Sequence, residues 1–497
     1  MNAVRMYAED GVSDNGRGVA APAAPERSEA TRYLCAAVHL DRGLKGSPGT
    51  QLRRQVLEGL MGDSIHAVGT SPGVDLRRVV VEVERSARRK LVRNVILAVL
   101  LLLALILTAV AKSVLVFALV FLLACEVVHV EAWISTYSVV ARRMLRGRFE
   151  PDDDAVVSRR LRPLLDEIEA AQSGNVTVYS GFSPFVGLGF DHGGWSFSVN
   201  TSEGKKDLGM PRRPKLFDVK DLYAHVAADV EALGLPNVSL YDRLYADGRQ
   251  IRDDRTLLPD ALRRPATSVP PEDVAAAVGQ AGEAVRHYKV IRVTGWGGEL
   301  VLSIFLRFMK VERSLFAEAC YFLLPPLNAA CHAADRVQPS PSGRDNLRLL
   351  WECIQATPLL WIRAPLEIVR VLTAPLRHGW RARRLRRQAA AAPDFDYGAR
   401  ASVRDVQKSG HYHQYFQQLD RDMYAKVIER QVLDSLLNFL EAHDVDTSEM
   451  RQRESTILNN GVMMSGGQFQ ADNVAVGTQA RAERGAKAPK SSGKAPA

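Results

Sequence analysis

The longest hydrophobic run of the chain extends from Val95 to Cys125, and Lys112 is its only charged residue. As one straight helix these 31 residues would be about 46 Å long, whereas the hydrocarbon core of a bilayer is about 30 Å thick. A single span would therefore leave part of the run outside the membrane. The pattern predicts instead a transmembrane helical hairpin over 93–133 that turns at Lys112 and Ser113.

Basic residues flank the hairpin: Arg88, Arg89, Lys90 and Arg93 precede it, and Arg142, Arg143, Arg146 and Arg148 follow it. Because Lys and Arg are enriched on the cytoplasmic side of membrane spans, both ends of the hairpin are predicted to be cytoplasmic and its tip to reach the far face. The abundance of Ala and Arg is typical of a high-GC bacterial genome. We therefore expect a multi-pass protein of the bacterial plasma membrane with both termini in the cytoplasm.

The chain before the hairpin divides into two parts. Residues 1–30 are rich in Gly, Ala, Pro and acidic residues, which indicates a disordered leader without the apolar core of a signal peptide. Residues 31–92 have apolar positions at helical spacing and are expected to form a small cytoplasmic helical subdomain. Asp75 is a suitable N-cap for a helix that continues into the first membrane arm.

After a helical connector at 134–172, the hydrophobic period changes from that of helices to the period of two that is typical of strands. Strands are predicted at Val176–Ser180, Trp195–Val199, Asn237–Tyr245 and Leu315–Leu324, with a helix at Asp218–Leu233 and a hairpin turn at Gly295–Gly298. This pattern predicts a cytoplasmic α+β domain over 173–342, built on an antiparallel or mixed sheet.

A second apolar segment, at 343–390, differs from the hairpin because Glu352, Arg363, Glu367 and Arg370 interrupt it. Each such charge costs about 2.5 to 3.5 kcal/mol at the centre of a bilayer, which argues against another span. Three prolines, Pro358, Pro365 and Pro375, are expected to break the segment into short helices.

An arginine-rich block closes this segment, with Trp380 among Arg377, Arg381, Arg383, Arg384, Arg386 and Arg387. The composition is typical of an amphipathic segment on an anionic leaflet, so we expect contact with anionic lipid through 377–387. Packing on the α+β domain and contact with nucleic acid are the alternatives, and a net charge of +9 over 497 residues does not require a nucleic-acid partner. Trp133, Tyr137 and Trp361 complete the predicted set of membrane-interface residues.

Glu126 and His129 lie one helical turn apart on the second arm and are candidate intramembrane polar residues. Solvation at the membrane interface is the alternative, because both lie near the point where the arm leaves the hydrocarbon. An ion path through only two helices would require several copies of the chain.

The C-terminal region at 391–450 is predicted to be helical, and its apolar positions between Ser402 and His443 lie on one face. This face is expected either to pack within the chain or to contact a second copy or another protein. The flexible tail at 451–497 is either disordered or able to form β-structure.

The chain shows no assembled catalytic set. Asp191 and His192 are adjacent, so on a strand they would face opposite sides, and Glu299 fits a turn or strand start. The histidines His332, His411 and His413 lack the further ligands of a zinc site, and the five cysteines form no CxxC motif. The glycine-rich loop Gly181–Trp195 joins two strands and precedes no helix, which argues against a phosphate site. We expect no cofactor, no metal and no catalytic residue.

Several segments carry a family resemblance: Arg32–Asp41, the hairpin, Val176–Gly187, Arg286–Leu300 and His411–Glu449. Together they resemble a family of uncharacterised integral membrane proteins from streptomycete-type actinobacteria. The resemblance implies a source and a membrane location but no activity. The tail at 459–482 is similar to short Gly/Asn/Ala-rich motifs of bacterial conflict and signalling proteins, which implies amyloid-like stacking.

These features favour a membrane-tethered scaffold or signalling component that is not an enzyme. Two other classes stay open. One is an oligomeric transport or pore subunit lined by Lys112, Glu126 and His129, and the other is a membrane-tethered enzyme that uses Asp191, His192 or Glu299.

Overall fold

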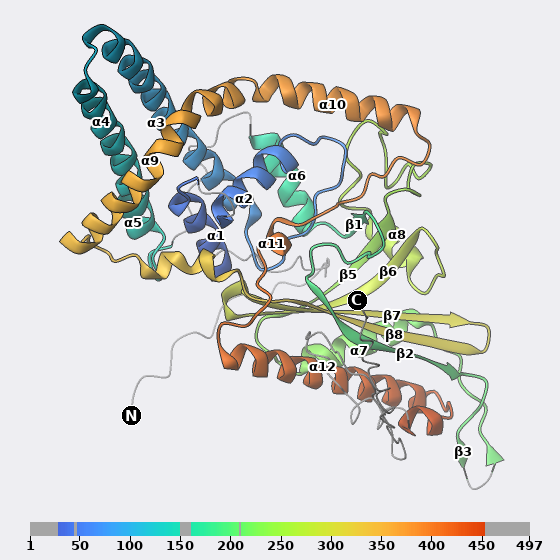
Figure 1. Ribbon diagram of the computed structural model, residues 1–497. Helices are drawn as coiled ribbons and strands as arrows, with labels where there is room; N and C mark the ends of the chain where they lie inside the picture. Colours follow the sequence, from blue (N-terminus) through green and yellow to red (C-terminus); the bar gives the residue numbers. More distant parts are fainter. Residues whose placement is uncertain (1–27, 44–46, 150–160, 208–209, 453–497) are drawn as a thin grey trace, which may run out of the picture.

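The structure is a computed structural model that describes residues 28–43, 47–149, 161–207 and 210–452. It contains an α+β domain on a mixed six-stranded sheet, a smaller helical unit beside it, and a long helical hairpin that projects from that unit (Figure 1). Almost all of the predicted leader and tail lies outside the described residues.

The N-terminal unit is built around α1 (Glu29–Leu40), whose side chains are nearly all buried. The Thr31 N–H donates to the Ser28 hydroxyl, which caps this helix. A short helix α2 (Pro48–Arg54) and the π-helix η1 (Gln55–Leu60) follow. The helical subdomain predicted before the hairpin is thus present in this part of the chain.

The hairpin begins with α3 (Leu76–Ala111), a single helix of 36 residues. Asp75 caps it by accepting a hydrogen bond from the Arg78 N–H at 3.1 Å, so the predicted continuity into the first arm is confirmed. Lys112 ends the helix in the left-handed conformation, with a φ of 48°. The second arm is α4 (Val114–Trp133), which continues through the π-helix η2 (Ile134–Val140) and α5 (Ala141–Arg143).

The sheet has the strand order β1-β5-β6-β7-β8-β2. Its strands are β1 (Val176–Tyr179), β2 (Phe190–Asn200), β5 (Val238–Asp247), β6 (Val285–Gly295), β7 (Leu300–Val311) and β8 (Ser314–Leu324). β1 and β5 pair in parallel and the other neighbours are antiparallel, so the predicted sheet is of the mixed kind. The turn predicted at Gly295–Gly298 is the short helix η4 (Trp296–Gly298). A separate ribbon pairs β3 (Lys206–Asp207) with β4 (Met210–Pro211).

Different elements cover the two faces of the sheet. α7 (Val219–Ala232) and α12 (Tyr415–Ala442) pack against one face and bury its aliphatic core (Figure 1). The other face carries an aromatic cluster of Phe185, Tyr241, Tyr245, Tyr288, Phe305 and Phe322. Two further helices, α6 (Arg162–Ser173) and α8 (Pro271–Ala277), precede β1 and β6.

After the short helix η5 (Ala329–Arg336), α9 (Gly343–Leu372) is one continuous helix, so the prediction that Pro358 and Pro365 break this segment is wrong. Both prolines lie on the exposed side of α9. Its opposite side packs on α3 and α4, and this packing offsets the backbone hydrogen bonds that proline removes. The break predicted at Pro375 is confirmed, because α10 (Ala374–Ala391) starts there and runs in a new direction (Figure 1).

The helix predicted over Ser402–His443 is interrupted. α11 (Val403–Val406) is a single turn, and α12 begins at Tyr415. Between them, the Ser409 N–H donates to the Pro326 carbonyl at 2.7 Å, beside a β-bridge between Leu327 and Lys408. Backbone hydrogen bonds to residues 326–327 therefore replace the helical hydrogen bonds that would have joined α11 to α12.

The two halves of α12 have different surroundings. Towards the C-terminus, Ile428, Val432 and Leu436 are buried against the sheet. Towards the N-terminus, Phe416, Leu419, Met423 and Val427 are exposed. Packing within the chain therefore accounts for only part of the predicted apolar face.

Candidate functional site at the base of the hairpin

Both arms of the hairpin expose large apolar side chains. Val114, at the tip, keeps 82% of its surface exposed. Others spread along both arms, among them Val99, Leu102, Leu105, Ile106, Val110, Leu115, Leu119 and Leu122. Soluble proteins rarely expose contiguous apolar patches of this extent. By length and composition α3 and α4 can each cross a membrane, so the hairpin is compatible with membrane association.

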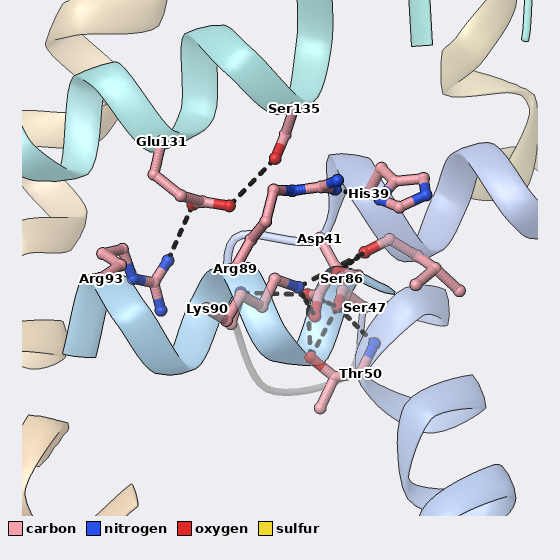
Figure 2. Close-up of polar contacts among 12 residues, drawn as sticks. His39, Asp41, Ser47, Thr50, Ser86, Arg89, Lys90, Arg93, Glu131 and Ser135 are labelled. Carbon is pink, nitrogen blue, oxygen red and sulfur yellow. Dashed lines mark hydrogen bonds and ion pairs between the residues drawn. The ribbon is translucent and has the colours of Figure 1, made fainter. Parts of the chain in front are cut away.

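Two buried ion pairs cross the base of the hairpin (Figure 2). Lys90 of α3 donates to the Asp41 carboxylate at 2.9 Å, with the two side chains 4% and 1% exposed. One turn further along α3, Arg93 donates to the Glu131 carboxylate of α4 at 3.1 Å, and Ser135 donates to Glu131 at 2.9 Å. The first pair fastens α3 to the N-terminal unit, and the second fastens α3 to α4.

Asp41 accepts several hydrogen bonds besides that from Lys90. The hydroxyls of Ser47 and Thr50 donate to its Oδ1 at 2.5 and 2.9 Å, and the Gly43 N–H donates at 3.0 Å. Burial by itself raises the pKa of this carboxyl, but Lys90 and the Ser47 hydroxyl outweigh burial, so the pKa is lowered. Asp41 therefore remains a carboxylate whose charge and lone pairs are both satisfied.

His39 and Glu82 form another buried contact on the same side of α3. The His39 Nε2 lies 2.8 Å from the Glu82 carboxylate. The Arg89 guanidinium hydrogen-bonds the other ring nitrogen, Nδ1 (Figure 2). Burial lowers the pKa of His39, although Glu82 opposes the shift. A neutral imidazole with its proton on Nε2 fits both contacts.

These contacts change the interpretation of the basic residues before the hairpin. Lys90 and Arg93 are buried in ion pairs and Arg88 pairs with Glu84, so this flank offers less free positive charge than the sequence predicts. The arginines after the hairpin, Arg142, Arg143, Arg146 and Arg148, are exposed. The exposed arginines of this second flank are therefore the positive charge that favours a cytoplasmic base. The neutralising carboxylates, Asp41 and Glu131, were not predicted as site residues.

Trp361 and Tyr137, both predicted for the membrane interface, are buried. Trp361 is 3% exposed, its indole N–H donates to the Leu97 carbonyl at 2.9 Å, and its ring centroid lies 5.6 Å from that of Phe117. Tyr137 belongs to the same core, next to the half-buried Trp133. These contacts make α9 a third helix of the hairpin bundle, so Trp361 and Tyr137 do not reach the outer surface.

α10 carries the exposed charges near the hairpin. Trp380 is 74% exposed, and all six arginines predicted for lipid contact are exposed, namely Arg377, Arg381, Arg383, Arg384, Arg386 and Arg387. The Arg381 guanidinium also donates to the Glu58 carbonyl at 3.2 Å, which holds α10 against η1. An exposed apolar row crosses from α9 into α10 at helical spacing: Ile362, Leu366, Val369, Leu372, Leu376 and Trp380.

Of the three residues predicted to line an ion path, Lys112 does not meet Glu126 and His129 within one chain. Glu126 lies 3.6 Å from His129 but is 62% exposed on the outer side of α4. Lys112 is exposed at the tip. Glu126 is 12 residues beyond the start of α4, which places it about 18 Å along the helix from the tip.

The candidate acid and base residues of the α+β domain are also separated. Asp191 is exposed on β2, where its carboxylate accepts a hydrogen bond from the Gly193 N–H at 2.9 Å. Glu299 instead lies with His332, whose Nε2 is 2.6 Å from the Glu299 carboxylate. The ring of His413 lies 4.6 Å from that of His332, so the fold brings Glu299 together with two of the histidines that were considered as zinc ligands.

This Glu299 group has no good nucleophile beside it among the described side chains. Cys331 is buried, and burial raises the pKa of its thiol to about 12, which keeps the thiol protonated. Within the described ranges, no group of three or more His, Cys, Asp or Glu residues is arranged to hold a metal ion.

The AbeC-like domain family matches residues 194–470, which is more than half of the chain. The matched range begins in β2 and includes α9, α10 and α12. The hairpin precedes this range and is not part of it. No curated protein matches the chain, and no solved structure does. This domain family is of uncharacterised type, and the actinobacterial source stays a prediction. The chain belongs to the AbeC-like domain family.

Proposed function

We propose that this protein is a membrane-tethered scaffold of the bacterial plasma membrane, which holds its AbeC-like domain at the cytoplasmic surface and is not itself an enzyme. The observation that carries the proposal is the exposed apolar hairpin. At its base one buried ion pair joins α3 to the N-terminal unit and a second joins α3 to α4. Apolar surface moved out of water stabilises by about 25 cal/mol per Å². A rigid base would pass the orientation of the hairpin on to the domain.

The proposed topology is multi-pass, with both termini in the cytoplasm and the tip at the far face. The exposed arginines that follow the hairpin favour a cytoplasmic base. The ion pair between Arg93 and Glu131 lies 19 positions from Lys112 on either side, about 27 Å along each arm. Each arm is therefore about as long as a hydrocarbon core is thick, but α9 packs on the part of α3 nearest the base and leaves a shorter length free.

A second contact with the membrane is proposed through α9 and α10. The apolar row from Ile362 to Trp380 suits the acyl-chain boundary of the near leaflet, and the arginines of α10 suit anionic headgroups. This arrangement favours lipid over nucleic acid as the partner of the arginines, because the apolar row continues from α9 onto α10, where Leu376 and Trp380 lie among the arginines.

A protein partner is proposed at the exposed half of α12. Phe416, Leu419, Met423 and Val427 form an apolar stripe there. In Figure 1, α12 covers the side of the sheet that is remote from the hairpin, so a partner would approach from the aqueous side. A second copy of the chain is the other candidate for this stripe.

The first experiment reconstitutes the full chain in phosphatidylcholine vesicles with and without phosphatidylglycerol. We expect the chain to float with both vesicles and to resist carbonate extraction. Replacing the six α10 arginines with glutamine should remove the extra binding to anionic vesicles and leave hairpin insertion intact. A chain that stays soluble without detergent or lipid would contradict the proposal.

The second experiment labels single cysteines in cells, in a Cys320→Ser background because Cys320 is the half-buried native thiol. Cysteine at Ser113 should react with an impermeant reagent from outside. Cysteine at the exposed Ala401 should react only after permeabilisation. Labelling of both sites from outside would contradict the topology.

A further inference from the structure

One part of the aromatic face of the sheet buries two arginines around a tyrosine. Tyr241 of β5 and Arg292 of β6 are 6% and 8% exposed, and the Arg292 guanidinium lies 5.1 Å from the centroid of the Tyr241 ring. Arg243, two positions after Tyr241, places its guanidinium 6.0 Å from the same ring and is 2% exposed. We call these three residues the Tyr241 cluster.

The unpaired polar groups of the Tyr241 cluster are all able to donate hydrogen bonds. Nε and Nη2 of Arg292, Nε of Arg243 and the Tyr241 hydroxyl are buried and find no partner among the described residues. Arg243 does have a structural role, because its Nη2 donates to the carbonyls of Ala171 and Gly174 at 3.3 and 2.6 Å, at the C-terminal end of α6. Arg292 makes no comparable contact with the described part of the chain.

The nearby carboxylates are engaged elsewhere. Asp242 follows Tyr241 on β5 and so faces the opposite side of the sheet, where it binds His287 and Lys289 at 2.9 and 2.8 Å. Glu318 accepts a hydrogen bond from Tyr288 at 3.1 Å and pairs with Arg307 at 3.5 Å. The Tyr241 cluster is thus a buried positive site without a compensating acid among the described residues, an arrangement that is costly unless an acceptor or an anion accompanies it.

We propose that the Tyr241 cluster binds a small oxyanion of the phosphate class. An oxyanion supplies both the acceptor oxygens for four donors and the negative charge that the two guanidiniums lack, whereas water supplies only acceptors. The planar fork of Arg292 offers two neighbouring N–H groups, Nε and Nη2, which match two oxygens of one anion. Arg292 keeps 8% of its surface exposed, and we place the entry of the anion at that edge of the cluster.

The test measures the thermal midpoint of the full chain in detergent while inorganic phosphate is titrated, with sodium chloride of equal ionic strength as the reference. We expect a saturable rise with phosphate that chloride does not reproduce. Arg292→Met keeps much of the side-chain length and removes the charge. It should abolish this rise and leave the phosphate-free midpoint unchanged or higher.

Two further variants separate binding from structure. Tyr241→Phe keeps the ring and removes one donor, so phosphate should bind about tenfold more weakly. Arg286→Met is the matched control, because Arg286 is an exposed arginine on the same strand, and its phosphate response should equal that of the unmodified chain. If Arg292→Met does not fold, Arg292→Lys replaces it, and loss of the fork should weaken binding by at least tenfold.

Equal effects of phosphate and chloride on the unmodified chain would overturn the proposal. A full phosphate response in Arg292→Met, or unchanged binding in Arg292→Lys, would overturn it as well. None of these results depends on membrane insertion, so this experiment can contradict the proposed anion site without contradicting the proposed membrane tether.

Discussion

The indole N–H of Trp361 donates to the backbone carbonyl of Leu97 at 2.9 Å, which joins α9 to α3 across 264 positions of sequence. The Trp361 ring also lies 5.6 and 5.7 Å from the rings of Phe117 and Phe121 on α4. One side chain of the AbeC-like region therefore contacts both arms of the hairpin. Trp361 thus provides a direct packing contact that couples the AbeC-like region to the hairpin.

Removing the Trp361 side chain should loosen this coupling. We expect Trp361→Ala to lower the free energy of unfolding by about 3 to 5 kcal/mol, because it opens a cavity between three helices. Trp361→Phe keeps most of the apolar contact and loses the hydrogen bond, at a cost of about 1 kcal/mol. Denaturant unfolding in detergent, followed by circular dichroism, measures both. The exposed Trp380 supplies the control, and a Trp380→Ala effect as large as that of Trp361→Ala would contradict this role.

The buried pair of Asp41 and Lys90 should be sensitive to the loss of one partner. Asp41→Ala leaves the Lys90 ammonium buried without its counter-charge, and we expect a loss of about 3 to 5 kcal/mol in the free energy of unfolding. The double variant Asp41→Leu with Lys90→Met removes both charges and should recover most of that loss. The surface pair of Arg88 and Glu84 gives the comparison, because Arg88→Met should change stability by less than about 1 kcal/mol. If the single and double variants lose the same free energy of unfolding, the buried charge of Lys90 is not what makes the single variant unstable.

Stability should fall as the pH decreases below about 6.5, the ordinary pKa of histidine. Burial lowers the pKa of His39 in the folded chain, so the unfolded chain binds this proton more tightly and gains from acidification. Each unit of pH between the two pKa values then costs about 1.4 kcal/mol. His39→Gln should flatten this part of the pH profile. The exposed His411 is the control, and a profile that His39→Gln leaves unchanged would contradict the assignment.

A second decrease in the free energy of unfolding is expected at lower pH, where Asp41 becomes protonated. The pKa of Asp41 is depressed in the folded chain, so its contribution to stability is present above the unfolded value of about 3.9 and disappears as the pH falls further. His39→Gln should leave this acid-dependent loss in place. The double variant without Asp41 and Lys90 should show a smaller loss, because other carboxylates with a depressed pKa, such as Asp63 and Asp242, still contribute. Unfolding curves measured between pH 3 and 8 separate the pH dependence due to His39 from that due to Asp41.

Much of the fold follows from local patterns in the sequence. The uninterrupted run from Val95 to Cys125 predicts the hairpin, and alternating residues predict β1, β2, β5 and β8. Local patterns fail where distant contacts decide the outcome. Pro358 and Pro365 stay inside α9 because α3 and α4 hold its other side, and the chain before α12 leaves the helical path because Ser409 binds Pro326.

The candidate site was only partly accessible to such reasoning. Arg93 and Glu131 each lie 19 positions from Lys112, so a turn at Lys112 places them opposite one another, and their pairing could have been predicted. Asp41 and Lys90 have no such symmetry, since a loop of the N-terminal unit brings Asp41 to the hairpin. The Tyr241 cluster could not be predicted either. β5 and β6 are buried on both faces, so the alternation of residues does not show which face of the sheet Arg292 lies on or that this face is covered.

In the proposed topology, the length of α3 that α9 leaves free sets the bilayer thickness that the protein should prefer. On α3, Ala111 lies 14 positions beyond Leu97, where Trp361 binds, which is about 21 Å of helix against about 30 Å for an average hydrocarbon core. This mismatch favours thin bilayers, at a cost of a fraction of a kcal/mol per Å in thicker ones. Labelling of Ser113→Cys at the far face should therefore decrease from vesicles with 14-carbon chains to vesicles with 22-carbon chains. Adding four leucines to each arm lengthens the hairpin by about 6 Å and should move the optimum to thicker bilayers. If labelling changes neither with the acyl-chain length of the lipid nor with the length of the hairpin arms, α9 does not limit the depth of insertion.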